Sequence, residues 1–302
     1  MLLSLILVLA QAGSAGWSSG RPPECGDPGG RTGNVWERAK SPELRRYCDL
    51  VASASSKLAG TTAMASAALG SARQAEQVLP GHAAPRVLEG RALAALGKLD
   101  EALAALNEGK ARDPGALDDP LALLAWARVL ARTGHVDQSA EAYRALLPRA
   151  SALSAAERAA ASVEAGLVAM ARGPSGLDEA AAALREGLRE AQDETQAVAV
   201  LALALALDRR GEGDESRALL SERIHGDPRS QLASPRAKDL LEVAPGETSA
   251  LAAVALEPID ATGAREAWQR FIEASASGPW AASARAHLAA LGGKRPAPRR
   301  GR

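Results

Sequence analysis

The four histidines are the side chains best suited to acid–base or metal chemistry, and their spacing supports neither. They are His82, His135, His225 and His287, spread along a chain of 302 residues. A zinc-binding helix would place two histidines four residues apart with a glutamate beside the first. No such spacing occurs in this sequence, so we interpret each histidine as a solvent-facing side chain.

Other catalytic constellations are also missing from the sequence. Serine and aspartate are abundant, but a nucleophile needs a base positioned beside it, and no histidine is placed for that role. No glycine-rich loop leads into a lysine and a Ser/Thr, as phosphate binding would require. The glycines at 173 and 176 are more simply explained by a turn between helices. We therefore predict no catalytic residue, no metal and no cofactor, and we do not expect an enzyme.

The two cysteines, Cys25 and Cys48, predict a disulfide if the chain is exported. Such a bridge would attach the Gly/Pro-rich segment 16–42 to the first helix, with Trp36 and Tyr47 packing it as a cap. In the chain-entropy description, a disulfide that closes a loop of this size stabilises the folded state by about 3 kcal/mol. The alternative is two unrelated reduced thiols. Two cysteines without a nearby histidine are too few for a metal site.

The N-terminal segment 1–15 resembles a secretory signal peptide. It begins MLLSLILVLA, which is shorter than the roughly 20 residues of a membrane span, and small residues follow at Ala10, Ala12 and Ala15. No Lys or Arg precedes the apolar stretch. We predict a periplasmic or secreted protein with no membrane span in the mature chain. The alternative is a cytoplasmic protein whose N-terminus is a buried strand or helix.

Composition favours helices and argues against a nucleic-acid partner. Hydrophobic residues make up 47% of the chain but aromatic residues only 3%, and the abundance of Ala and Leu is typical of helical proteins. The 36 basic residues balance the 36 acidic ones, whereas nucleic-acid-binding domains carry a basic excess. The tail 292–302 combines Pro, Gly and like charges, so we predict that it is a basic disordered tail.

An internal repeat is the strongest signal in the sequence. The segments 93–114 and 207–228 place a glycine, an aspartate, a small residue, a leucine and a proline at equal offsets. Gly134, Asp137, Ser139 and Tyr143 repeat most of that spacing. At these positions the chain resembles the tetratricopeptide (TPR) repeat, a helix–turn–helix unit of about 34 residues.

The resemblance implies an all-α, right-handed helix-hairpin solenoid of about six TPR-like units over residues 43–291. The expected units are 49–82, 83–116, 120–153, 161–194, 197–230 and 248–281. Each unit would cross its two helices at a small residue, and the six are Ala68, Ala102, Ser139, Ala180, Ser216 and Ala267. The segment 231–247 would be an insertion with one short helix at 235–243. Residues 280–291 would form a capping helix.

The resemblance also implies that the first helices of the units line a concave groove. The side chains expected there are Arg91, Leu124, Arg128, Arg132, Arg172, Leu201, Leu205 and Arg209. The planar guanidinium of arginine presents N–H donors in a geometry that matches a carboxylate. One interpretation is therefore a groove for an acidic or C-terminal peptide segment. The alternative is that these arginines pair with Asp and Glu of neighbouring helices. The expected function is a protein- or peptide-binding scaffold in the cell envelope or periplasm. The alternatives are a cytoplasmic adaptor and an accessory subunit of an enzyme complex.

Overall fold

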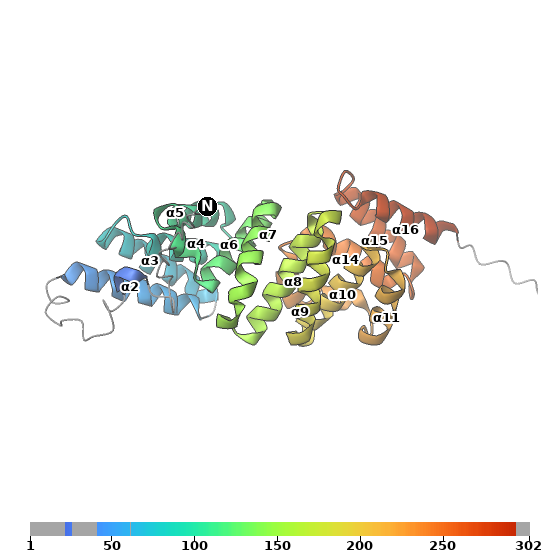
Figure 1. Ribbon diagram of the computed structural model, residues 1–302, viewed down its shortest axis with the longest axis horizontal. Helices are drawn as coiled ribbons and strands as arrows, with labels where there is room; N and C mark the ends of the chain where they lie inside the picture. Colours follow the sequence, from blue (N-terminus) through green and yellow to red (C-terminus); the bar gives the residue numbers. More distant parts are fainter. Residues whose placement is uncertain (1–21, 26–40, 61, 294–302) are drawn as a thin grey trace, which may run out of the picture. The chain divides into compact units, whose positions relative to one another are not determined.

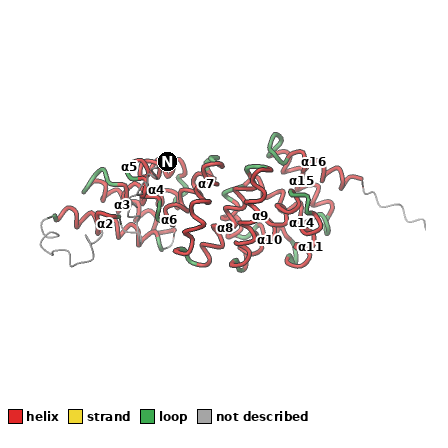
Figure 2. Tube along the Cα trace, in the orientation of Figure 1, coloured by secondary structure: helices red, strands yellow, loops and turns green. Residues whose placement is uncertain are grey.

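The structure, a computed structural model, describes residues 22–25, 41–60 and 62–293. The signal-like leader 1–15, Trp36 and residues 294–302 of the predicted tail lie outside these ranges. The tail was predicted to begin at residue 292, but residues 292 and 293 belong to the last helix. Figure 2 shows helices and connecting loops throughout the described part of the chain, which contains no strand. The all-α fold class predicted from the sequence is therefore confirmed.

The chain divides into two compact units, residues 1–126 and 127–302. In the first unit, α2 packs against α3 and α4 against α5 as neighbouring pairs (Figure 1). Helix α6 begins in this unit and continues into the second. The elements are η2 (Pro23–Cys25), α2 (Pro42–Leu58), η3 (Thr62–Met64), α3 (Ala65–Val78), α4 (Ala83–Ala95), α5 (Leu99–Arg112), η4 (Pro114–Leu117) and α6 (Pro120–Arg132).

In the second unit, α8 packs against α9, α10 against α11 and α14 against α15, and α16 lies on α15. The elements are α7 (Val136–Leu146), η5 (Leu147–Ala152), α8 (Ala155–Ala171), η6 (Pro174–Gly176), α9 (Leu177–Glu190), α10 (Asp193–Arg209), α11 (Gly213–Arg223), α12 (Pro228–Leu232), α13 (Pro235–Leu241), η7 (Pro245–Glu247), α14 (Thr248–Leu256), α15 (Ala261–Ala274) and α16 (Ala281–Gly293).

Three of the turns within hairpins have the same hydrogen-bonded geometry. In each, the backbone N–H three residues beyond the last residue of the first helix donates to the carbonyl five residues earlier, across a glycine in the left-handed region. The donor–acceptor pairs are Lys98–Leu93, His135–Leu130 and Glu212–Leu207, at 2.9, 2.8 and 2.9 Å. The glycines are Gly97, Gly134 and Gly211, with φ of 75°, 83° and 84°. Only glycine adopts this conformation without a steric cost, which explains its recurrence in the sequence.

The small residues expected at the helix crossings are all buried. A Cβ added to Gly90 of α4 would lie 3.0 Å from the carbonyl oxygen of Ala102 in α5. A Cβ added to Gly166 of α8 would lie 3.1 Å from the carbonyl oxygen of Ala180 in α9. The distance between packed helices depends on the side chains at the contact, so these small residues permit a close approach of the two backbones.

Two of the crossings contain serine, and the structure gives its hydroxyl a partner that the sequence pattern did not predict. Ser139 Oγ donates to the carbonyl of Ala127, and Ser216 Oγ donates to the carbonyl of Ala204, each at 2.8 Å. Both serines are buried. Because a buried hydroxyl without a partner is costly, each hydrogen bond allows serine to replace alanine at the crossing.

The segment around the insertion contains two short helices. The helix expected at 235–243 corresponds to α13, which ends at Leu241. Helix α12 precedes the insertion's own helix, α13. Each begins at a proline, which suits the first helical position, and each has a side-chain cap before it. Asp227 accepts from the backbone N–H of Arg229 at 3.0 Å, and Ser234 Oγ accepts from that of Ala237 at 3.1 Å. Two caps and two prolines therefore define two helices.

Candidate partner-binding face

The structure joins Cys25 of η2 to Cys48 of α2 in a disulfide. Beside it, the buried Tyr47 donates a hydrogen bond of 2.6 Å to Glu24. Burial, and secondarily this hydrogen bond, raises the pKa of Tyr47 well above its usual range, so the phenol remains a donor at any physiological pH. The disulfide and the hydrogen bond together attach η2 to α2.

The three leucines expected in the groove are buried, so they do not line an open surface. They are Leu124, Leu201 and Leu205. The two in α10 belong to a helix that is packed by α8, α9, α11 and α14, and also by α12 and by α13 of the insertion. Sequence reasoning placed the insertion between repeats but did not predict which surface it would cover.

Two of the predicted groove arginines bind carboxylates of that insertion. Arg132, the last residue of α6, lies with its Nη1 3.0 Å from Glu242 Oε2, directly after α13. Arg209, the last residue of α10, lies with its Nη2 2.7 Å from Glu247 Oε2, at the end of η7. The residues predicted to meet an acidic peptide therefore meet an acidic segment of the same chain.

Helix α13 is amphipathic, and its apolar side is buried. Ala237, Leu240 and Leu241 are buried, whereas Lys238 and Asp239 are exposed. At its N-terminal end, Arg236 Nε donates to Thr195 Oγ1 of α10 at 3.3 Å. We call the sides of α8 and α10 that contact α13, together with Arg132, the α8–α10 face. It holds a short helix by apolar contacts along its length and by polar contacts at both ends.

The remaining predicted arginines have partners within their own unit. Arg128 Nε donates to Glu164 Oε2 at 2.9 Å, and Tyr143 donates to the same oxygen at 3.0 Å. Burial acts to lower the pKa of Arg128, but the charge and hydrogen bonds of Glu164 hold it above its ordinary value. Arg172 and Arg91 also lie beside carboxylates. Arg172 pairs with Asp137 at 3.0 Å and with Glu179 at 3.3 Å, and Arg91 lies 3.9 Å from Asp119. Pairing with neighbouring carboxylates was the alternative interpretation of these arginines.

His287 is the histidine whose predicted solvent-facing position is wrong. Its ring stacks on Trp268 with centroids 4.7 Å apart, and its side chain is 21% exposed. Nε2 lies 3.0 Å from Asp208 and Nδ1 lies 2.8 Å from Glu257. Hydrogen bonds to Asp208, then to Glu257, raise the pKa of His287 to about 10. The protonated ring therefore attaches α16 to α10, α15 and the end of α14, a structural role that its sequence neighbours do not reveal.

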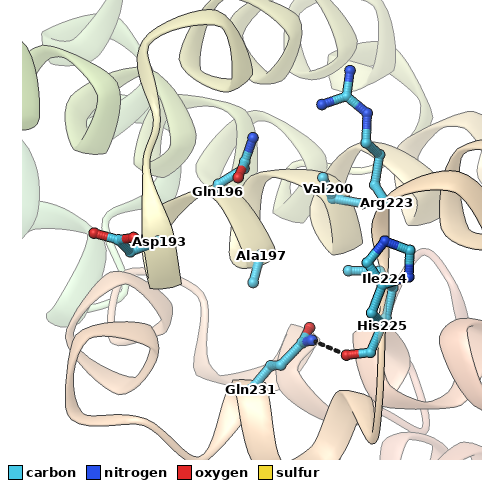
Figure 3. Close-up of a pocket in the computed structure, with 8 residues that line it drawn as sticks. All are labelled: Asp193, Gln196, Ala197, Val200, Arg223, Ile224, His225 and Gln231. Carbon is cyan, nitrogen blue, oxygen red and sulfur yellow. Dashed lines mark hydrogen bonds between the residues drawn. The ribbon is translucent and has the colours of Figure 1, made fainter.

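A small pocket lies at the start of α10 (Figure 3). Its volume is about 190 Å³, and Asp193, at its edge, has a φ of 48°. Across the pocket, Gln231 Nε2 donates to the carbonyl of His225 at 3.0 Å. The lining residues are Asp193, Gln196, Ala197, Val200, Arg223, Ile224, His225 and Gln231. Ligand sites for small molecules are usually 300–1,000 Å³, and none of these side chains is a Ser, Thr, Cys or Lys nucleophile.

Within the described residues, no cluster of three or more His, Cys, Asp or Glu side chains is arranged to hold a metal ion. No helix in that part of the chain combines the length and apolar character needed to cross a bilayer.

These features define an all-α protein built of repeated helical hairpins. Among solved structures, the chain is similar to YrrB, described as a TPR protein with an unusual peptide-binding site, at 15% identity and a TM-score of 0.41, over 71% of this chain and 97% of that one. It is also similar to the flexible tandem repeat domain of a bacterial cellulose synthase subunit, at 21% identity and a TM-score of 0.29, over 76% and 90%. No family model matches the chain, and no curated protein matches its sequence.

Proposed function

We propose that this chain is a non-catalytic protein-binding scaffold of the cell envelope or periplasm. The observation that supports this most directly is the α8–α10 face. It already holds an amphipathic helix, α13, with Arg132 bound to Glu242 at one end. Laying the apolar side of a helix into an apolar groove is a recurrent mode of peptide recognition. The proposed partner is a protein or peptide that presents carboxylates to such arginines.

The chemistry of the face suits this class of partner. A guanidinium binds a carboxylate through charge-assisted hydrogen bonds, which are stronger than neutral ones. The apolar part of the contact adds the hydrophobic effect, since burial contributes about 25 cal/mol per Å² of apolar surface removed from water. The arginine then selects for an acidic residue at one end of the bound segment.

The disulfide supports a location outside the cytoplasm. Disulfides persist in oxidising compartments and are rare in the cytosol, and the bridge between Cys25 and Cys48 follows the signal-like segment 1–15. The N-terminal mass of the native protein separates the two locations. Cleavage near Ala12 or Ala15 agrees with export. An intact Met1 would favour the cytoplasmic adaptor or the accessory subunit.

Crosslinking in the native organism, followed by mass spectrometry, tests the scaffold proposal. Among the described residues, an amine-reactive reagent reports on Lys57, Lys98 and Lys110 in the first unit and on the exposed Lys238 of α13 in the second. We expect a small, reproducible set of partners attached at the same lysines in repeated preparations. A Lys238→Arg chain controls for specificity because it should lose only the products formed at that position. Recovery of the chain without any crosslinked partner would contradict the proposal.

A further inference from the structure

We propose that the insertion is an internal ligand, and that a partner helix of the same chemistry binds the α8–α10 face in place of α13. This inference rests on the proposed scaffold function and specifies the partner that the face accepts. The partner segment is an amphipathic helix with apolar side chains at the spacing of Ala237, Leu240 and Leu241. It carries a glutamate at the position of Glu242.

Helix α13 has the features of a bound peptide. It is seven residues long, with Pro235 at its first turn, Ser234 as its cap and Pro245 shortly after its end. Its backbone hydrogen bonds are satisfied within the segment, as in Lys238 N to Ser234 O at 3.0 Å and Glu242 N to Lys238 O at 3.1 Å. Side chains therefore provide its attachment to α8 and α10, and another helix could supply equivalent side chains.

The surface beneath α13 has the character of a binding face. Residues 159–170 of α8 and 198–207 of α10 are buried all round their helices, whereas a surface helix normally carries a polar side. Removing α13 would expose part of this apolar surface. Contiguous exposed apolar surface of this kind marks interaction sites in soluble proteins, so the face is suited to being covered by one helix or another.

The two ion pairs of the insertion differ in exposure, and the difference indicates which part exchanges. The Arg132 and Glu242 side chains are 27% and 48% exposed, and exposed pairs contribute only about 0–1 kcal/mol. The Arg209 and Glu247 side chains are 1% and 8% exposed. In the exchange, residues 234–244 leave the face while Glu247 remains bound to Arg209.

The test measures the binding of a fluorescein-labelled synthetic peptide of residues 233–246 to two full-length variants. One variant changes Glu242 and the other changes Arg132, so each removes one member of the ion pair. Glu242→Lys weakens only the internal segment, so the chain should bind the peptide about fivefold more tightly than the unaltered chain. Arg132→Glu removes the same ion pair from the internal segment and from the peptide, so the two losses offset each other and the peptide should bind within about twofold of its affinity for the unaltered chain. If the salt bridge were purely structural and α13 did not exchange, the Glu242→Lys chain would bind the peptide no more tightly than the unaltered chain.

Two controls make the result specific. Asp239→Lys introduces the same charge change on the exposed side of α13 and should leave peptide binding unchanged. A peptide carrying Glu242→Lys should bind the Arg132→Glu chain about fivefold more tightly than the unaltered peptide does, because its lysine can pair with the substituted carboxylate. Both variants of the pair alter partly exposed side chains, and circular dichroism should show native helicity for each.

The outcomes separate the two proposals. Peptide binding that does not tighten in the folded Glu242→Lys chain, or that tightens no more there than in the folded Arg132→Glu chain, would overturn the internal-ligand proposal. If partners are nevertheless crosslinked in the native organism, the scaffold proposal stands without it. Peptide exchange without any crosslinked partner would contradict the scaffold proposal alone.

Discussion

Arg209 and Glu247 form an ion pair of 2.7 Å whose two side chains are almost entirely buried. The guanidinium carbon lies 4.4 Å from the ring centroid of Trp280 and 5.7 Å from that of Phe271, within the range of cation–π attraction. Burial lowers the pKa of Arg209, and the neighbouring Glu247 acts in the opposite direction. The end of α10 and the end of the insertion are therefore joined through a buried charge.

Removing one member of this pair should cost more than removing both. Arg209→Met leaves Glu247 buried without its counter-charge, and we expect a loss of about 3–5 kcal/mol in the free energy of unfolding. The double variant Arg209→Met with Glu247→Leu should be near the native value or above it, because apolar residues of similar volume replace buried pairs without loss. Urea unfolding measures both. A double variant as unstable as the sum of its single changes would contradict this account.

The contribution of His287 should depend on pH in the alkaline range. Its partners Asp208 and Glu257 raise its folded pKa to about 10, against an ordinary value of 6.5. A raised pKa stabilises the folded state fully below the unfolded value, and the contribution is lost as the pH rises through the folded value. We expect the stability difference between the native chain and His287→Gln to be largest at pH 6 and to shrink towards pH 10.

Thermal or urea unfolding of both chains across that range measures this difference. Lysines and tyrosines elsewhere in the chain titrate alike in both chains, so their effect on stability drops out of the difference. A difference that stays constant from pH 6 to pH 10.5 would show that the ring is not held in its protonated form.

The close crossing of α4 and α5 predicts that Ala102 tolerates no larger side chain. Ala102→Leu adds three carbons where Ala102 is fully buried and its carbonyl approaches Gly90, so overpacking should cost about 1–3 kcal/mol. Ala104→Leu is the matched control, because Ala104 lies on the exposed side of the same helix. Equal melting temperatures for the two variants would mean that the crossing lies elsewhere.

The turn glycines and the small residues were predictable from the sequence because both are local requirements. A positive φ at Gly97 and a close approach at Ala102 each restrict the residue type at one position. These positions recur at the spacing of the repeat, and that recurrence is what allowed the all-α hairpin fold to be predicted from the sequence.

The carboxylate partners of the arginines could not be predicted in the same way. Arg132 meets Glu242, and Arg209 meets Glu247, only because the insertion turns back onto α8 and α10. No local pattern encodes that course. The same reason explains the error at His287, whose partners Asp208 and Glu257 lie far from it in the sequence. The covered groove and the buried histidine are both consequences of long-range packing.

Two glycines should respond oppositely to alanine. Gly134 has a φ of 83°, in the left-handed region where a Cβ crowds the backbone. Gly134→Ala should therefore lower the free energy of unfolding by about 1–2 kcal/mol. Gly70 lies within α3, where an added Cβ meets nothing within 4 Å. Gly70→Ala should therefore stabilise the chain by about 0.5–1 kcal/mol. Melting temperatures that shift in the same direction for Gly134→Ala and Gly70→Ala would contradict the turn geometry at Gly134.

Hydrogen exchange on the unaltered, full-length chain tests most directly whether α13 is a ligand of the α8–α10 face or a fixed part of its core. Local opening exposes amides without global unfolding. We predict that the hydrogen-bonded amides of residues 238–242 exchange about a hundredfold faster than those in the middle of α8 and α10, and that the free peptide of residues 233–246 speeds their exchange further. Equal protection of α13, α8 and α10, unaffected by the peptide, would show that α13 is a fixed part of the core.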